Sequence, residues 1–463
     1  MAGKVKKGFS TYLFILFLML VAAALVTLLV MIFRPFKEVL GYQYICYSDE
    51  VTKDKVTDGS SDDLLDFSSL EEIQINCSYA TVSVERPKDC KKYSITFKNF
   101  VTGFASADAN IKFSYNIYYE NGSNDKVLCV DVHEPEASLY FAKNVSVSIC
   151  LPDKEDANLE NVELNIENTS GNISIGCVTA SSNKITLASL KLQTTRGRIY
   201  LGAGLDGAID KIFIQTKRGG IDCPINLHAQ DYFTLNAKSG TLNFNNLSFG
   251  AGNLATINIG NCEFRAGTVI GDINLKMLAG YLDVEDFIGD ISANNPAEQL
   301  SAATITIGEV WGNLSFPFAN SSRINIGKFG GGKFYVKGTS GSVKLGETNA
   351  FAWIEMTTGS IDIKACYDFE AKTTSGKINA VIDRSDVMDE INITSKKGRV
   401  KLGVPSKLEF ILNVYNTDGE MRNAGSVNVE GFDGMFELPL VINNGNKPIN
   451  ITTNSKVEVY KVA

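Results

Sequence analysis

Branched apolar and polar residues alternate along most of this chain, and the alternation restarts after a short recurring phrase. In each copy a glycine closes a polar turn, and apolar residues then occupy every second position, as in Thr169–Ile175 and Thr195–Leu201. A period of two places the apolar side chains on one face of a β-strand and the polar ones on the other. Every copy therefore predicts a turn followed by a half-buried strand.

The copies recur about every 20 residues, which is typical of repeats that bury their apolar faces by stacking on one another. We therefore predict an all-β chain in which residues 161–463 form one parallel, right-handed β-solenoid. Glycine suits the corners because a positive φ costs it nothing. The predicted corner residues are Gly171, Gly197, Gly240, Gly341, Gly359, Gly376 and Gly398. A β-sandwich with regularly spaced turns is the alternative.

Residues 69–160 contain alternating strands that lack the glycine phrase. Turn residues at Arg86–Asp89 and Asn121–Asn124 separate these strands, which predicts an N-terminal β-hairpin region. Residues 34–68 include Ser48–Asp66, which is rich in Asp, Lys, Ser and Thr and has no apolar period. We interpret residues 34–68 as a polar linker.

Residues 11–33 contain no charge. A helix of this length spans about 34 Å, which is enough for a hydrocarbon core of about 30 Å. We predict an uncleaved transmembrane signal-anchor helix here. Lysines precede it, so residues 1–10 are expected in the cytoplasm and the body outside. A cleaved signal peptide is the alternative, because Ala22–Ala24 resembles a cleavage site.

Charge and cysteine usage exclude some function classes. The formal net charge of −8 disfavours a nucleic-acid partner, which needs a basic surface. The nine cysteines include no C-x-x-C pair, so no zinc or thioredoxin-like motif is indicated. Cys129 and Cys150 each alternate onto the more polar face of a predicted strand. Outside the cell they could form a disulfide, and unpaired thiols are the alternative.

Two glycine-rich stretches approach nucleotide-binding motifs, but a predicted strand follows each where a helix is required. They are residues 202–207, which fit G-x-G-x-x-G, and residues 327–334, which approach a P-loop. The two histidines, His133 and His228, lie outside any catalytic signature. The densest acidic patch, which we interpret as a solvated face, comprises Asp283, Glu285, Asp286 and Asp290. We therefore predict no catalytic centre, cofactor or metal site.

Aromatic residues cluster within the repeats and are the better indication of a binding surface. Phe316 and Phe351 also fit a core. Aromatic rows on a solenoid can hold glycans or protein partners, so we select Trp311, Tyr335 and Trp353 as the candidate binding surface.

The exported, singly anchored layout, Leu151-Pro152 after a strand, and the Thr-x-Ser-Gly-x-Ile-like phrase resemble the bacterial adhesin-like, toast-rack family over residues 70–463. The family phrase is T-x-S-G-D-I, and its Asp is replaced here by Asn172, Ser342, Ser360 or Lys377. The resemblance implies an envelope-associated, non-catalytic β-solenoid. We expect a membrane-anchored binding or scaffolding module at the cell membrane, with envelope glycans or proteins as partners. The alternatives are a carbohydrate-active β-helix enzyme and a polymerising envelope scaffold.

Overall fold

The computed structural model describes residues 14–29, 42–55, 65, 67, 70–106, 114–122, 125–133, 139–153, 159–177, 184–293, 300–365, 367–383, 389–423, 426–432, 438–443 and 445–462. An α-helix covers residues 14–29. Within the described ranges, no helix has both the length and the apolarity needed to span a membrane. The predicted cytoplasmic segment 1–10, both ends of the predicted 11–33 span, and Cys366 lie outside the described residues.

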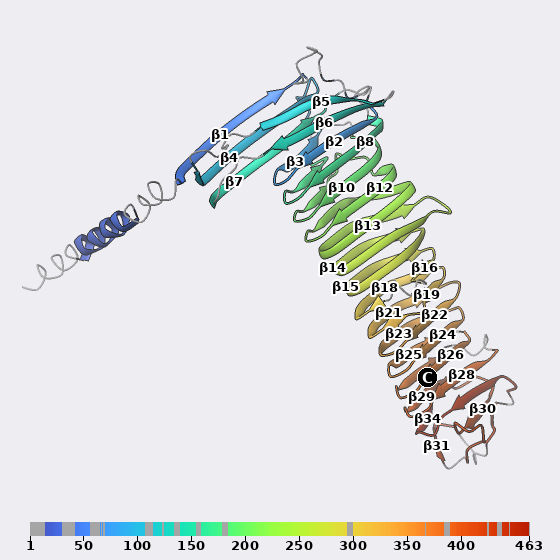
Figure 1. Ribbon diagram of the computed structural model, residues 1–463. Helices are drawn as coiled ribbons and strands as arrows, with labels where there is room; N and C mark the ends of the chain where they lie inside the picture. Colours follow the sequence, from blue (N-terminus) through green and yellow to red (C-terminus); the bar gives the residue numbers. More distant parts are fainter. Residues whose placement is uncertain are drawn as a thin grey trace, which may run out of the picture.

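The body is a rod of stacked β-strands that form two walls (Figure 1). The first wall contains β2 (Glu72–Cys77), β8 (Leu159–Asn168), β10 (Leu187–Thr194), β12 (Ala208–Thr216), β16 (Ile291–Ser292), β19 (Leu314–Phe316), β22 (Phe334–Gly338), β24 (Ala352–Met356), β26 (Phe369–Thr373) and β28 (Ile391–Ser395). The second wall contains β3 (Thr81–Glu85), β9 (Ile173–Ile175), β11 (Ile199–Leu201), β18 (Ala303–Trp311), β21 (Ser322–Phe329), β23 (Gly341–Thr348), β25 (Ser360–Ala365), β27 (Ile378–Ile382) and β29 (Val400–Pro405). Three long strands continue from one wall into the other: β13 (Ile221–Phe249), β14 (Leu254–Ile270) and β15 (Asp272–Ile288). A separate short pair joins β17 (Leu300–Ser301) and β20 (Ala319–Asn320).

Successive turns of the chain pair in parallel from β8 to β29, as the repeat predicted. Alternate residues are buried in each strand, so that Ile354 of β24 and Ala371 of β26 face the interior in register. The apolar row of each turn thus covers the next, and the turns share one continuous core. The β-sandwich alternative is wrong, because its strands would pair antiparallel.

The corner glycines stack along the rod, and crowding rather than backbone conformation explains most of them. A Cβ atom on Gly376 would overlap the carbonyl oxygen of Gly359, and one on Gly398 would overlap that of Gly376. Of the predicted corner residues, only Gly240 and Gly341 have a positive φ. The predicted reason for glycine therefore holds for these two, and close approach of the neighbouring turn explains the others.

The N-terminal end of the rod departs from the sequence order of the turns. There, β6 (Asp125–His133) and β7 (Leu139–Cys150) lie outside β2 and β3. The chain then crosses the first turn and continues on its other side with β8 and β9. The parallel stack therefore begins at β2, well before the predicted start at residue 161.

The C-terminal end is also out of order. The last strands, β33 (Pro448–Thr452) and β34 (Val457–Val462), pair with β28 and β29 on one side. On the other side they pair with β30 (Phe410–Tyr415) and β31 (Val427–Glu430). The final turn is therefore inserted into the stack, and Figure 1 places the C-terminus inside the rod rather than at its tip.

Antiparallel strands occur at both ends, so the fold is mixed rather than parallel throughout. β1 (Tyr42–Lys53) pairs with β4 (Ser94–Ser106), and β4 pairs with β7. β5 (Ser114–Gly122) and β6 form a hairpin of the predicted kind. β32 (Leu440–Ile442) runs antiparallel to β30.

β1 corrects the interpretation of residues 34–68 as a linker throughout. It pairs with β4 along its whole length, and Ile45 is buried. Its charged composition hid the strand, because an antiparallel pair tolerates a solvated face. The turn at Arg86–Asp89 does not close a hairpin either, because β3 pairs with β7 and β9 whereas β4 pairs with β1 and β7.

Candidate functional site

The outward face of the first wall carries a row of polar side chains that line up from strand to strand. Parallel strands pair in register, so side chains at equivalent positions lie one above another, about 4.8 Å apart. We call this row the polar column. It consists of Asp131, Asn76, Glu167, Gln193, Gln215, Asn236 and Asn258.

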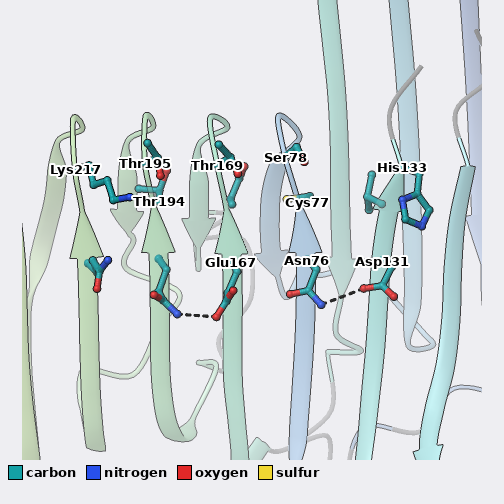
Figure 2. Close-up of a pocket in the computed structure, with 14 residues that line it drawn as sticks. Asn76, Cys77, Ser78, Asp131, His133, Glu167, Thr169, Thr194, Thr195 and Lys217 are labelled. Carbon is teal, nitrogen blue, oxygen red and sulfur yellow. Dashed lines mark hydrogen bonds between the residues drawn. The ribbon is translucent and has the colours of Figure 1, made fainter. Parts of the chain in front are cut away.

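Hydrogen bonds join neighbours within the polar column. Asn76 Nδ2 donates to Asp131 Oδ1 over 3.0 Å, and Gln193 Nε2 donates to Glu167 Oε1 over 2.7 Å (Figure 2). The Tyr118 hydroxyl donates to Asp131 Oδ2 over 3.0 Å, and this bond raises the pKa of the Tyr118 phenol. These contacts hold the planar amide and carboxylate groups in fixed orientations.

A pocket of about 540 Å³ opens at the N-terminal end of the polar column. It forms because β2 ends at Cys77 and turns, whereas β6 continues past the Asn76–Asp131 pair to His133. The corners that follow β8, β10 and β12 complete it (Figure 2). Besides five members of the polar column, the lining includes His133, Lys217 and the hydroxyl groups of Thr169, Thr194 and Thr195.

Two of the three predicted aromatic residues meet on the same wall. Tyr335 of β22 and Trp353 of β24 are in register, and their rings stack with centroids 4.6 Å apart and planes within 8°. Both side chains are half-buried and point outward. We call them the aromatic pair. The two rings cover each other's inner faces, so a ligand can meet only their edges and the faces turned away from each other.

Trp311 does not join the aromatic pair. It lies at the end of β18, whose partners are β15 and β21 rather than strands of the first wall. The side chain is 46% exposed, and Lys328 Nζ lies 5.2 Å from its ring centroid. The predicted surface of three aromatic residues is therefore divided between two sides of the rod.

The predicted acidic patch is engaged within the fold. The Asp290 carboxylate accepts hydrogen bonds from the Asn313 backbone N–H over 2.7 Å and from Asn313 Nδ2. Asp283 lies opposite Arg265 in the register of β14 and β15. In the part of the chain that the structure describes, no three His, Cys, Asp or Glu side chains are placed to share a metal ion.

The two histidines have different surroundings. His228 Nδ1 lies 2.8 Å from Ser248 Oγ, and Nε2 lies 3.0 Å from Gln230 Oε1, so both ring nitrogens have partners in the fold. His133 is exposed at the rim of the pocket.

Cys129 and Cys150 are both free thiols. The disulfide considered between them does not form, because Cys129 lies on β6 beside the first wall whereas Cys150 ends β7 beside the second. Burial, together with the neighbouring Cys90 thiol, raises the pKa of the Cys150 thiol to about 12.

The polar column was missed in the sequence, although a signal for it exists. Glu167, Gln193, Gln215 and Asn236 each lie four residues before a glycine of the turn that follows. That position points outward and precedes the buried corner residue, so a polar residue recurring there marks the column. Asn76 and Asp131 lack such a glycine, and only the out-of-order pairing of β6, β2 and β8 adds them.

Comparisons with known proteins match a family profile to most of the chain. The profile of the family Toastrack DUF4097 matches residues 70–324 and 289–455. No curated protein sequence matches the chain. A solved structure of a "putative cell adhesion protein" from Clostridium sporogenes is 9% identical, with 90% of this chain and 99% of that chain covered and a TM-score of 0.15. A "putative adhesin" from Parabacteroides merdae is 11% identical, with 90% and 96% covered and a TM-score of 0.16.

Proposed function

The chain belongs to the family Toastrack DUF4097, and on that premise we propose that it is a membrane-anchored, non-catalytic module that binds glycans through the first wall, outside the cytoplasm. The observation that carries this proposal is the aromatic pair on a polar, hydrogen-bonding face. A sugar ring has an apolar face of C–H groups and a rim of hydroxyl groups. The ring faces turned away from each other suit the apolar face of the sugar, and the amides and carboxylates along the wall suit the rim.

The N-terminal helix supports membrane anchoring. Its large apolar side chains are exposed, for example Phe14 at 62% and Leu20 at 62%. A continuous exposed apolar surface is rare on a soluble domain and is stabilised when an apolar phase covers it. The uncharged stretch of residues 11–33 extends beyond the described helix on both sides. We therefore retain the signal-anchor as part of the proposal, with the rod projecting from the membrane.

The test uses the full chain in lipid nanodiscs and the fact that it contains two tryptophans. Trp311→Phe leaves Trp353 as the sole tryptophan reporter. Titration with a β-1,4-linked glucose hexamer or N-acetylglucosamine hexamer should shift its emission. Trp353→Phe, which leaves only Trp311, should show no shift and should bind about tenfold more weakly by calorimetry. If neither hexamer changes Trp353 emission or releases heat, the proposal is wrong.

A further inference from the structure

We propose that the pocket at the N-terminal end of the polar column is a separate binding site for a neutral saccharide unit. The inference rests on the proposed glycan binding and adds a second, independent contact on the same face of the rod. Its shape, its hydrogen-bonding groups and its charge each point to this class of ligand.

The pocket has the size of a small-molecule site and is open to solvent on its outer side. Its volume of about 540 Å³ lies in the usual range for small-molecule sites. The end of β6 stands beside the corners of the next three turns because β6 continues straight where β2 turns. The wall of the pocket at the end of β6 is therefore formed by backbone, and its position does not depend on the rotamer of a surface side chain.

The lining offers many hydrogen-bonding groups whose bonding capacity is unfilled. The bonds to Asp131 and Glu167 use one N–H each of Asn76 and Gln193, which leaves both amide oxygens as acceptors. The Gln215 amide adds further donor and acceptor positions next in register. Cys77 and Val132 are the apolar contributors to the described lining. Such an alternation of donors and acceptors matches a polyol and does not match an apolar ligand.

The pocket lining carries charges of both signs, with two carboxylates and one lysine. Asp131 and Glu167 are acidic, and Lys217 reaches toward the Thr194–Thr195 corner from the other side (Figure 2). Two carboxylates disfavour an anionic ligand such as a phosphate or a sulfated glycan, whereas one lysine prevents the site from being strongly anionic. A neutral saccharide therefore fits better than a charged one.

The pocket and the aromatic pair are too far apart for a short ligand to touch both. Six inter-strand steps separate β12, at the edge of the pocket, from β22. At about 4.8 Å per step the separation is about 29 Å. A disaccharide therefore reports on the pocket alone, and this separates the two sites experimentally.

The experiment measures calorimetric binding of a β-1,4-linked glucose disaccharide and an N-acetylglucosamine disaccharide to the full chain in nanodiscs. Glu167→Ala and Gln215→Ala should each weaken binding about tenfold or more. Asn258→Ala is the matched control: it removes an outward amide of the same column, outside the pocket, and should leave binding within about twofold. Glu167 and Gln215 both face outward, so both variants should fold. Their unfolding temperatures check this.

Two outcomes would overturn the proposal. One is that the unmodified chain binds neither disaccharide. The other is that it binds one, but Glu167→Ala and Gln215→Ala bind it as well as Asn258→Ala does. Trp353→Phe should leave disaccharide binding unchanged. Disaccharide binding without any Trp353 emission shift on hexamer addition would instead contradict the aromatic pair and leave the pocket standing.

Discussion

At the scale of single residues, a corner is described by three positions: the glycine, the residue three before it and the residue four before it. The corner glycine admits the carbonyl oxygen of the neighbouring turn. At some corners the residue three positions earlier supplies an oxygen that accepts the glycine N–H, as Asn168 does for Gly171 over 3.0 Å and Ser395 does for Gly398 over 3.0 Å. The residue one position before that points outward. A single turn thus specifies stacking distance, corner closure and surface chemistry in five consecutive residues.

Gly376→Ala tests whether crowding or backbone conformation requires glycine at the corners. The new Cβ would overlap backbone of the neighbouring turn, so we expect a loss of about 3 kcal/mol or more in unfolding free energy. Gly252→Ala is the matched control: its φ is +81° but nothing lies within 4 Å, and it should cost about 1 kcal/mol. Asp283→Ala should change stability by less than about 0.5 kcal/mol. Urea unfolding measures all three, and equal losses for the two glycines would contradict the steric explanation.

Buried thiols make stability depend on alkaline pH. Burial raises the pKa of Cys223 from 9.0 to about 12. Because the folded-state pKa lies above the unfolded value, the neutral thiol stabilises the fold fully below pH 9, and this contribution is lost as pH rises toward 12. The unfolding temperature of the unmodified chain should therefore fall faster above pH 9 than that of Cys223→Ala. Parallel pH profiles for the two proteins would contradict the prediction.

At the scale of elements, strands taken out of sequence order lie at both ends of the rod. A simple solenoid would expose the edge of its last turn, and such an edge invites pairing with another chain. Here the last turn in sequence is held between two earlier ones. Its side chains are as buried as those of the middle turns: Ile449, Ile451 and Val457 are 0% exposed.

Deleting residues 448–463 should therefore also destabilise the neighbouring strands that remain in the chain. It uncovers β28 and β29 and leaves β30 and β31 without their parallel partners. Hydrogen exchange should become fast in β28 and β30 together, while β10 and β12 stay protected, because each turn contacts only its neighbours. Ile451→Ala should cost about 2–5 kcal/mol, whereas Val441→Ala, at a 52% exposed position, should cost under about 0.5 kcal/mol. If β30 stayed protected from hydrogen exchange, β33 and β34 would not be needed to hold β30 and β31 on the rod.

At the scale of the whole molecule, the repeat period predicted the stacked architecture, because every copy of the glycine phrase predicts the same turn followed by a strand. The ends were not predictable in this way. β1 lacks an apolar period because, apart from Ile45, its described side chains are half-buried or exposed on both faces, and no local signal says that β6 returns beside β2. The pocket depends on that return, so its residues could not be assembled from the sequence, although Glu167 and Gln193 follow a readable pattern. Tyr335 and Trp353 lie together on the first wall and Trp311 lies on the second, because the sequence does not say which side of the rod a residue faces. The binding role of all three stays a prediction.

The β1–β4 ladder determines how the molecule responds to mechanical load. Tyr42 lies opposite Ser106 at one end of the ladder, and Lys53 lies at the other end. At that second end β4 pairs with the part of β7 that ends at Cys150, and this part of β7 also pairs with β3 of the rod. A pull on the chain before Tyr42, opposed by a load on the rod, therefore acts along the strands. Antiparallel hydrogen bonds run perpendicular to that direction, so they resist shear together instead of opening one by one. A pull of this kind therefore loads the whole β1–β4 ladder in shear, the geometry in which its hydrogen bonds share the force.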